Sequence, residues 1–203
     1  VNGLVGSEMC IRDSFNSNLP QIFIALTFIL INYVALNNNF LISIHSIKRK
    51  SYGTTFFPLS FLILSIFFWE YEPYFFLSFM ILSFSDPIAS IVGENIKKPR
   101  KFHVMGDKKS IEGSITFFVI SFIILFTGSS LLLTLSLPSK IFFSIFTAIG
   151  ATIAEMSSSK GSDNISIPIV SILLMIAYEY RFKYINDVYD ILNSEIFILF
   201  IIM

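Results

Sequence analysis

The chain has 203 residues, equal numbers of acidic and basic side chains, and a mean hydropathy of +0.75. Hydrophobic side chains make up 54% of it and charged ones 14%, about half of the charged fraction of a soluble domain. This composition excludes a disordered chain, a nucleic-acid binder that relies on bulk positive charge, and, with Cys10 as its one cysteine, a disulfide-stapled domain. The apolar residues come in long runs and not in alternation, which predicts an all-α integral membrane protein instead of an outer-membrane barrel.

The first residues differ in composition from the rest of the chain. Residues 1–14 read VNGLVGSEMCIRDS and have neither the charged start nor the apolar core of a signal peptide. We expect residues 1–14 to be a non-native leader and residues 15–203 to form a single membrane-embedded domain that is N-terminally incomplete. No internal repeat or low-complexity linker divides residues 15–203.

Six apolar runs follow in chain order, and the second and the last are short for the roughly 20 residues that a helix needs to cross the hydrocarbon. The runs are Gln21–Leu36, Phe56–Trp69, Pro73–Val92, Ile115–Leu137, Lys140–Met156 and Ile165–Tyr178. A seventh, partial run begins near Ile196. The sequence therefore predicts a polytopic bundle of about six to seven transmembrane helices.

Basic residues are concentrated in alternate loops between these runs. Ten lie in the loops after the first, third and fifth runs, whereas the intervening loops hold three, Lys140, Arg181 and Lys183. Since cytoplasmic loops carry the excess of Lys and Arg, we expect the face with ten basic residues to be cytoplasmic. These ten are Lys48, Arg49, Lys50, Lys97, Lys98, Arg100, Lys101, Lys108, Lys109 and Lys160.

Two polar segments at this expected face lie at or inside apolar runs. The first, RKSYGTTFFP, is a basic flank followed by a helix start that Ser51 or Thr54 could cap. The second, SDPIASIVG, places Asp86 within an apolar run. An ionisable side chain there is costly in a membrane and favours a functional role, while the structural alternative is that Asp86 caps a helix that restarts at Pro87.

A third segment, residues 106–114, precedes the fourth run. Its lysines and hydroxyls at a helix start suit phosphate, because backbone N–H groups, the positive end of the helix dipole and ammonium groups converge there. The spacing GxxxxGK[ST] is absent, so the segment is not a Walker A loop. The structural alternative is a topogenic lysine pair, Lys108 and Lys109, beside a helix cap formed by Ser110 and Glu112.

The fourth segment holds Glu155 and Asp163 on the two sides of a short serine-rich turn. Asp163 or Asn164 alone is more often a helix N-cap than a ligand. Two carboxylates at the same face as Asp86, however, could hold Mg²⁺ against the phosphates of a nucleotide, because Mg²⁺ commonly takes one or two carboxylates together with phosphate oxygens and water.

In combination, SDPIASIVG, KKSIEGS and an acidic residue followed by SDNISIP resemble the CTP-dependent polyprenol kinase family, which includes dolichol kinase, phytol kinase and the CTP-dependent diacylglycerol kinase. RKSYGTTFFP is similar to a segment that precedes these motifs, so the resemblance covers about Arg49 to Pro168. Ser85 stands where the family usually has Gly before the Asp, and the family's earlier helix is absent. The family is distantly related to the phosphatidate cytidylyltransferases.

The resemblance implies transfer of a phosphoryl group from CTP to the hydroxyl of a membrane lipid alcohol (a polyprenol, phytol or diacylglycerol) at the cytoplasmic face, with Mg²⁺ as the cofactor. The residues it implies for catalysis are Asp86, Lys109, Glu112 and Asp163, with Glu112 orienting the lysines or a metal-bound water. Those it implies for binding the nucleotide are Gly106, Lys108, Lys109, Ser110, Gly113, Ser114 and Asn164. Those it implies for the metal are Asp86, Glu155 and Asp163.

Two other functions are compatible with the same residues. A phosphatidate cytidylyltransferase would make CDP-diacylglycerol, but the HGG-type segment with paired aspartates of those enzymes is not seen here. A small ion-coupled transporter would place its charges near the bilayer midplane on broken helices. The charges of this chain cluster at one face beside lysines and glycines, which favours phosphate chemistry.

Overall fold

The computed structural model describes residues 17–38, 53–104 and 107–181, which are mostly helical. Two apolar helices, α2 (Leu19–Asn38) and α4 (Gly53–Phe67), come first. The four helices after them are long and apolar enough to cross a membrane. They are Trp69–Asn95, α7 (Ile111–Leu132), α8 (Leu137–Ser157) and a last helix, Asp163–Arg181.

Each of the six apolar runs falls on one of these helices, so the six predicted helices are confirmed as helices. The partial run near Ile196 and the expected leader, residues 1–14, lie outside the described residues. Large apolar side chains cover the outside of the bundle, which fits contact with lipid. The most exposed among them include Phe23, Phe67, Leu131, Phe142 and Ile153.

The helix Trp69–Asn95 changes its winding along its length. A 3₁₀ turn, η1 (Trp69–Tyr71), leads into α5 (Glu72–Met80), and a π-helix, η2 (Ile81–Ser85), leads into α6 (Asp86–Asn95). Pro87 lacks the N–H that would bond to the carbonyl four residues earlier, and its ring crowds that turn. The wider π-helix just before Pro87 accommodates both effects, and it ends where Asp86 begins α6.

Serine side chains define the starts of α7 and α8. Ser110 Oγ accepts the N–H of Gly113 at 3.2 Å, and Ser136 Oγ accepts the N–H of Ser139 at 3.4 Å. Each serine thereby satisfies one of the backbone donors that a helix start leaves without an intrahelical partner. The structural alternative for Ser110, a helix N-cap, is therefore confirmed, and α7 starts at the next residue, Ile111.

A small antiparallel sheet, which the sequence did not predict, accompanies the helices of the mostly helical fold. Strands β1 (Lys101–Val104) and β2 (Asp107–Ser110) pair with Lys101 opposite Ser110 and Val104 opposite Asp107. The strand sequences KFHV and DKKS are only four residues long. The first alternates polar and apolar residues, but the second is wholly polar and lacks the alternation that predicts a half-buried strand. Strand β2 ends at Ser110 and α7 begins at Ile111, whose N–H continues the pairing of the two segments by donating to Arg100 O at 3.0 Å.

The core of the bundle is apolar with a few polar contacts between helices. Its largest fully buried side chains include Phe117, Phe143, Leu64, Leu77, Ile81 and Leu125. Ser121 Oγ donates to Ser85 Oγ at 2.9 Å, and this hydrogen bond joins α7 to the π-helix. Both serines are fully buried, so the hydrogen bond satisfies hydroxyls that would otherwise be costly between helices.

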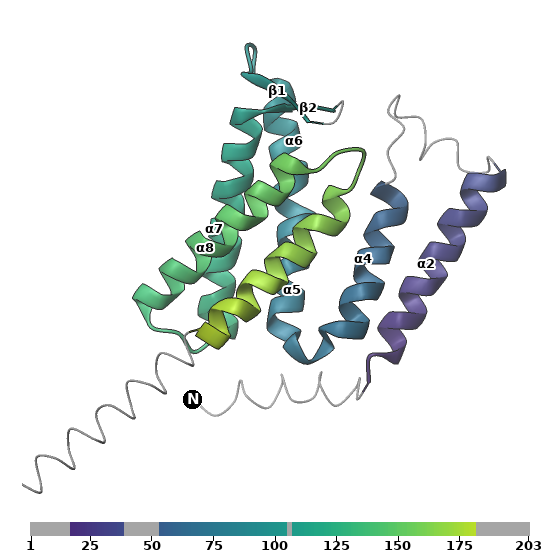
Figure 1. Cartoon of the computed structure of the whole chain (residues 1–203), viewed down its shortest axis with the longest axis horizontal. Helices are drawn as coiled ribbons and strands as arrows, with labels where there is room; N and C mark the ends of the chain where they lie inside the picture. The colour runs from purple at the N-terminus through teal and green to yellow at the C-terminus, as the bar shows by residue number, and fades with distance from the viewer. Residues whose placement is uncertain (1–16, 39–52, 105–106, 182–203) are drawn as a thin grey trace, which may run out of the picture.

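The arrangement of the helices brings the polar segments to one end of the bundle (Figure 1). Helix α2 lies beside α4 at one edge, and α7 packs against both α6 and α8. The β-hairpin stands where α6 ends and α7 begins, and the turn between α8 and the helix Asp163–Arg181 lies at the same end. The second, third and fourth polar segments of the sequence therefore meet.

Candidate functional site

A polar cavity of about 570 Å³ lies at the hairpin end of the bundle. Its walls come from α6, from the hairpin with the first turn of α7, and from the turn between α8 and the helix Asp163–Arg181. The lining residues are Asp86, Ala89, Ser90, Gly93, Glu94, Lys101, Asp107, Lys108, Lys109, Ser110, Gly113, Ser114, Glu155, Lys160, Gly161, Asp163 and Asn164.

The cavity collects most of the residues that the sequence singled out. Asp86, Lys108, Lys109, Ser110, Gly113, Ser114, Glu155, Asp163 and Asn164 all line it. Gly106 lies outside the described residues. Glu112 is not among the lining residues, because its carboxylate turns to the start of the hairpin. There its Oε1 accepts Arg100 Nε and its Oε2 accepts the Arg100 backbone N–H, each at 3.0 Å.

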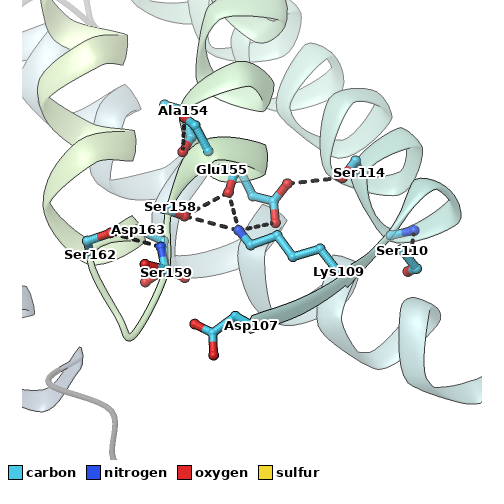
Figure 2. A network of polar contacts seen from close by, with 12 residues as sticks. Asp107, Lys109, Ser110, Ser114, Ala154, Glu155, Ser158, Ser159, Ser162 and Asp163 are labelled. Carbon is cyan, nitrogen blue, oxygen red and sulfur yellow. Dashed lines mark hydrogen bonds and ion pairs between the residues drawn. The ribbon is translucent and has the colours of Figure 1, made fainter. Parts of the chain in front are cut away.

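The floor of the cavity holds a nearly buried ion pair, Lys109 with Glu155 (Figure 2). Lys109 Nζ lies 2.8 Å from Glu155 Oε1, and only 13% and 11% of the two side chains are exposed. Lys109 also donates to the Glu155 backbone carbonyl and, at 3.0 Å, to Ser158 Oγ. An ammonium group has three N–H donors, so these contacts engage all of them.

The second oxygen of Glu155 is engaged as well. Ser114 Oγ, on the first turns of α7, donates to Glu155 Oε2 at 3.1 Å. The ion pair therefore joins three elements: β2 through Lys109, α7 through Ser114, and the C-terminal end of α8 through Glu155. A lysine at this position also suits the negative end of the α8 dipole.

Asp86 is half-buried in the cavity wall, and in the described part of the chain no hydrogen bond or ion pair engages its carboxylate. The charges that act on it are those of Asp163 and Glu155, which repel it, and that of Lys109, which attracts it. A carboxylate that is held near two others without a hydrogen-bond donor is suited to bind a cation.

Asp163 and Asn164 form the start of the last helix as well as part of the cavity wall. Asp163 Oδ1 accepts the Asn164 backbone N–H at 3.0 Å and Asn164 Nδ2 at 3.1 Å. Asn164 Nδ2 also donates to Gly161 O at 3.2 Å, which ties the side chain to the preceding turn. These contacts are local, as expected of a helix start, and they leave Asp163 at the cavity wall.

Two further lysines belong to the cavity, although their positions in the sequence predict only a role in membrane topology. Lys101 and Lys160 line it together with Lys108, and none of the three makes an ion pair with another described residue. The signal for Lys160 was present, since it lies between the two acidic residues of the fourth segment. With the starts of α7 and of the last helix in the wall, these ammonium groups suit a strongly anionic ligand such as a polyphosphate.

The carboxylates of the cavity can share a metal with such a ligand. Within the residues that the structure describes, no group of three or more His, Cys, Asp and Glu is arranged to hold a metal ion by itself. Asp86 and Asp163 offer carboxylate oxygens, which Mg²⁺ prefers, and both oxygens of Glu155 already accept hydrogen bonds. The donor set therefore fits Mg²⁺ when phosphate oxygens and water complete the coordination.

Comparison with known proteins supports the resemblance. The chain is similar to phytol kinase from Synechocystis sp.. The two are 30% identical over 145 residues, which cover 68% of this chain and 59% of the relative. No known family profile matches the chain, and no solved structure is significantly similar to it. The matched region therefore spans about three fifths of the length of that relative.

Proposed function

We propose that the chain is a membrane-embedded kinase that transfers a phosphoryl group from CTP to the hydroxyl of a lipid alcohol, with Mg²⁺ as cofactor. The observation that carries the proposal is the cavity in which carboxylates, two helix starts and lysines that have no ion pair among the described residues meet at one end of an apolar bundle. The similarity to phytol kinase supports a lipid alcohol as acceptor.

The phosphates of CTP would lie against the lysines that have no ion-pair partner in the described residues, which are Lys101, Lys108 and Lys160. Phosphoryl transfer requires mainly the positioning of donor and acceptor and the neutralisation of charge on the transferred group. Backbone N–H groups near Ser110 and Gly113 add to this neutralisation, because the start of α7 lies in the wall.

Asp86 and Asp163 would hold Mg²⁺, which supplies charge neutralisation at the phosphates. Either carboxylate could also accept the proton of the acceptor hydroxyl. Glu155 and Lys109 contribute in another way, because each already engages the other. They fix the relative positions of β2, α7 and α8 on which the cavity depends.

The lipid acceptor would keep its chain in the bilayer and bring its hydroxyl to the cavity. Four apolar helices and an apolar exterior fit a protein that lies in the membrane, and the cavity is at the end of the bundle. A hydroxyl at the level of the lipid headgroups is within reach of a site at that level. The excess of basic residues at this end supports a cytoplasmic active site, where soluble CTP is available.

The test is a product assay with the purified chain in nanodiscs. CTP labelled at the γ-phosphate is supplied with Mg²⁺ and, separately, with phytol, a polyprenol, diacylglycerol or phosphatidate. A kinase transfers the label to an alcohol and releases CDP. Release of pyrophosphate with formation of CDP-lipid from phosphatidate would establish the cytidylyltransferase instead, and solute flux into vesicles without CTP would establish the transporter.

A further inference from the structure

One contact joins two parts of the cavity lining that come from segments far apart in the sequence. The backbone N–H of Lys160, in the turn after α8, donates to Oδ2 of Asp107, the first residue of β2. Both residues line the cavity, and the chain between them comprises all of α7 and α8. No motif considered in the sequence assigns a role to Asp107.

The backbone of Lys160 is in a conformation that lysine seldom adopts. Its φ is 52° and that of Gly161 is 90°. Ser162 N–H donates to Ser159 O at 2.9 Å, so Lys160 and Gly161 are the central residues of a β-turn. Positive φ at both central positions is the pattern of a type I′ turn, which strongly prefers Asn followed by Gly.

A residue in a rare backbone region persists only when its surroundings hold it there. Inside the turn, Ser159 N–H donates to Ser162 Oγ at 3.0 Å, which closes the turn without engaging Lys160. In the described residues the contact to the Lys160 backbone from outside the turn is the one from Asp107. A charged acceptor makes this hydrogen bond stronger than one between neutral groups.

The position of this turn decides what the cavity presents to a ligand. The turn contains Lys160, which lines the cavity. It is followed in the chain by Asp163 and Asn164, which also line the cavity and begin the last helix. Asp107 is followed at once by Lys108 and Lys109 on the same strand. The contact therefore links the wall with the hairpin lysines to the wall with the Asp163 carboxylate.

We propose that Asp107 is a positioning residue: by accepting the N–H of Lys160 it holds the left-handed turn and so places Lys160 and Asp163 opposite the hairpin lysines. The structural part of this inference stands by itself, and its effect on CTP rests on the proposed function. Asp107 touches neither phosphate nor metal in this role, so an uncharged side chain with an acceptor oxygen can replace it.

The first experiment measures the turn and needs no activity. The full chain is labelled with nitrogen-15 lysine in nanodiscs, and amide hydrogen exchange is followed by NMR. Asp107→Ala should speed exchange at the Lys160 amide by about tenfold, the loss expected for a hydrogen bond to a charged acceptor. The Lys140 amide, which donates to Ser136 O at 2.9 Å, is the internal control and should not change.

The second experiment measures the effect on CTP. Asp107→Ala should lower kcat/KM for CTP by about tenfold, since the displaced turn carries Lys160 and leads directly into Asp163. Asp107→Asn should restore most of kcat/KM, because its amide oxygen accepts the same N–H. Lys160→Asn should bind CTP more tightly than Lys160→Ala, although both lack the ammonium group, because Asn favours the left-handed turn.

The outcomes separate the two hypotheses. If Asp107→Asn is as impaired with CTP as Asp107→Ala although its Lys160 amide exchanges as slowly as in wild type, the charge of Asp107 contacts a ligand directly and the positioning role is overturned. Unchanged exchange of the Lys160 amide in Asp107→Ala would overturn it as well. If the wild-type chain transfers no phosphoryl group from CTP, the proposed function fails, and the exchange measurement still decides whether Asp107 holds the turn.

Discussion

Lys109 Nζ lies 2.8 Å from Oε1 of Glu155, and both side chains are almost completely removed from solvent. The pair divides the charges of the cavity into two sets. Lys109 and Glu155 satisfy each other, whereas Asp86, Lys101, Lys108 and Lys160 make no hydrogen bond or ion pair through their side chains to other described residues. The first set is expected to determine stability, and the second is expected to determine activity.

The ion pair between Lys109 and Glu155 predicts a large loss of stability when one of the two side chains is removed. Glu155→Leu should lower the free energy of unfolding by about 3–5 kcal/mol, because it leaves the ammonium of Lys109 buried without its partner. The double variant Lys109→Met with Glu155→Leu should lose clearly less than the sum of the two single losses. Thermal unfolding in detergent measures all three variants. Lys108→Met, which removes a neighbouring lysine that makes no ion pair within the described residues, is the control and should unfold close to wild type. Additive losses would show that the two charges do not interact.

For substitution of Asp86 we expect the opposite behaviour, which is a loss of activity without a loss of stability. Asp86→Asn keeps the shape of a side chain that has no hydrogen-bond donor to lose in the described structure, so the unfolding temperature should stay near that of wild type. Turnover of CTP with a lipid alcohol should fall by at least about 100-fold, the range for a positioned acid, base or metal ligand. Any remaining activity should require more Mg²⁺.

A matched control for Asp86 is available on the same continuous helix. Glu72→Gln makes the same change of a carboxylate to an amide at the opposite end of Trp69–Asn95, far from the cavity. It should leave both turnover and unfolding close to wild type. Full turnover in Asp86→Asn, or an equal loss in Glu72→Gln, would contradict the assignment of Asp86 to the site.

The contact between α6 and α7 predicts a stability effect at a glycine. A Cβ at Gly93 would lie 2.6 Å from Ser110 Oγ and 3.6 Å from Gly113 Cα. Gly93→Ala should therefore cost about 1–3 kcal/mol of unfolding free energy, as overpacking in a core does. Adding Ser110→Gly should recover most of this loss, because it removes the clashing atom and glycine at an N-cap costs only a few tenths of a kcal/mol.

Gly128 is a comparison site for the clash expected at Gly93. A Cβ there would meet Leu77 Cδ2, which is the end of a flexible side chain and can rotate away. Gly128→Ala should therefore be tolerated better than Gly93→Ala in the same thermal unfolding assay. If Ser110→Gly fails to rescue Gly93→Ala, the close approach of α6 and α7 at this point does not limit stability.

The positions of the helices could be predicted from the sequence because they depend on local information. A long apolar run such as Ile115–Leu137 becomes a helix wherever it packs, and Ser110 indicates where that helix starts. The sequence also predicts that Asp86, Lys108 and Asp163 lie at the same end of the bundle. The basic residues in alternate loops assign these loops, and the polar residues beside them, to one face of the membrane. Both inferences need no knowledge of which helix touches which.

The contacts inside the cavity depend on tertiary packing and could not be predicted. The sequence assigned Lys109 to phosphate and Glu155 to a metal, and only packing of β2 against α8 brings the two side chains together. The hairpin was missed because DKKS has no apolar alternation. The residues around Lys160 do not predict its left-handed conformation either. The hydrogen bond to its N–H comes from Asp107, which lies two helices earlier in the chain.

Glu112 provides a test between a chemical role and a structural one. Its carboxylate accepts two N–H groups of Arg100 at 3.0 Å and is not part of the cavity wall. Since this contact joins the residue before β1 to the first turn of α7, Glu112 should act by holding the hairpin. Glu112→Gln keeps an oxygen that accepts the Arg100 backbone N–H, and it should retain kcat close to that of wild type.

A double-mutant cycle on the turnover of CTP decides between the two roles of Glu112. If Glu112 holds the hairpin through Arg100, then Glu112→Ala and Arg100→Ala should impair turnover to a similar extent, and the double variant should be no worse than either. High salt should weaken the wild-type contact, because the Arg100 side chain is 71% exposed. A much larger loss in Glu112→Ala than in Arg100→Ala, with Glu112→Gln equally impaired, would instead place the carboxylate in the chemistry, as the resemblance to the kinase family implied.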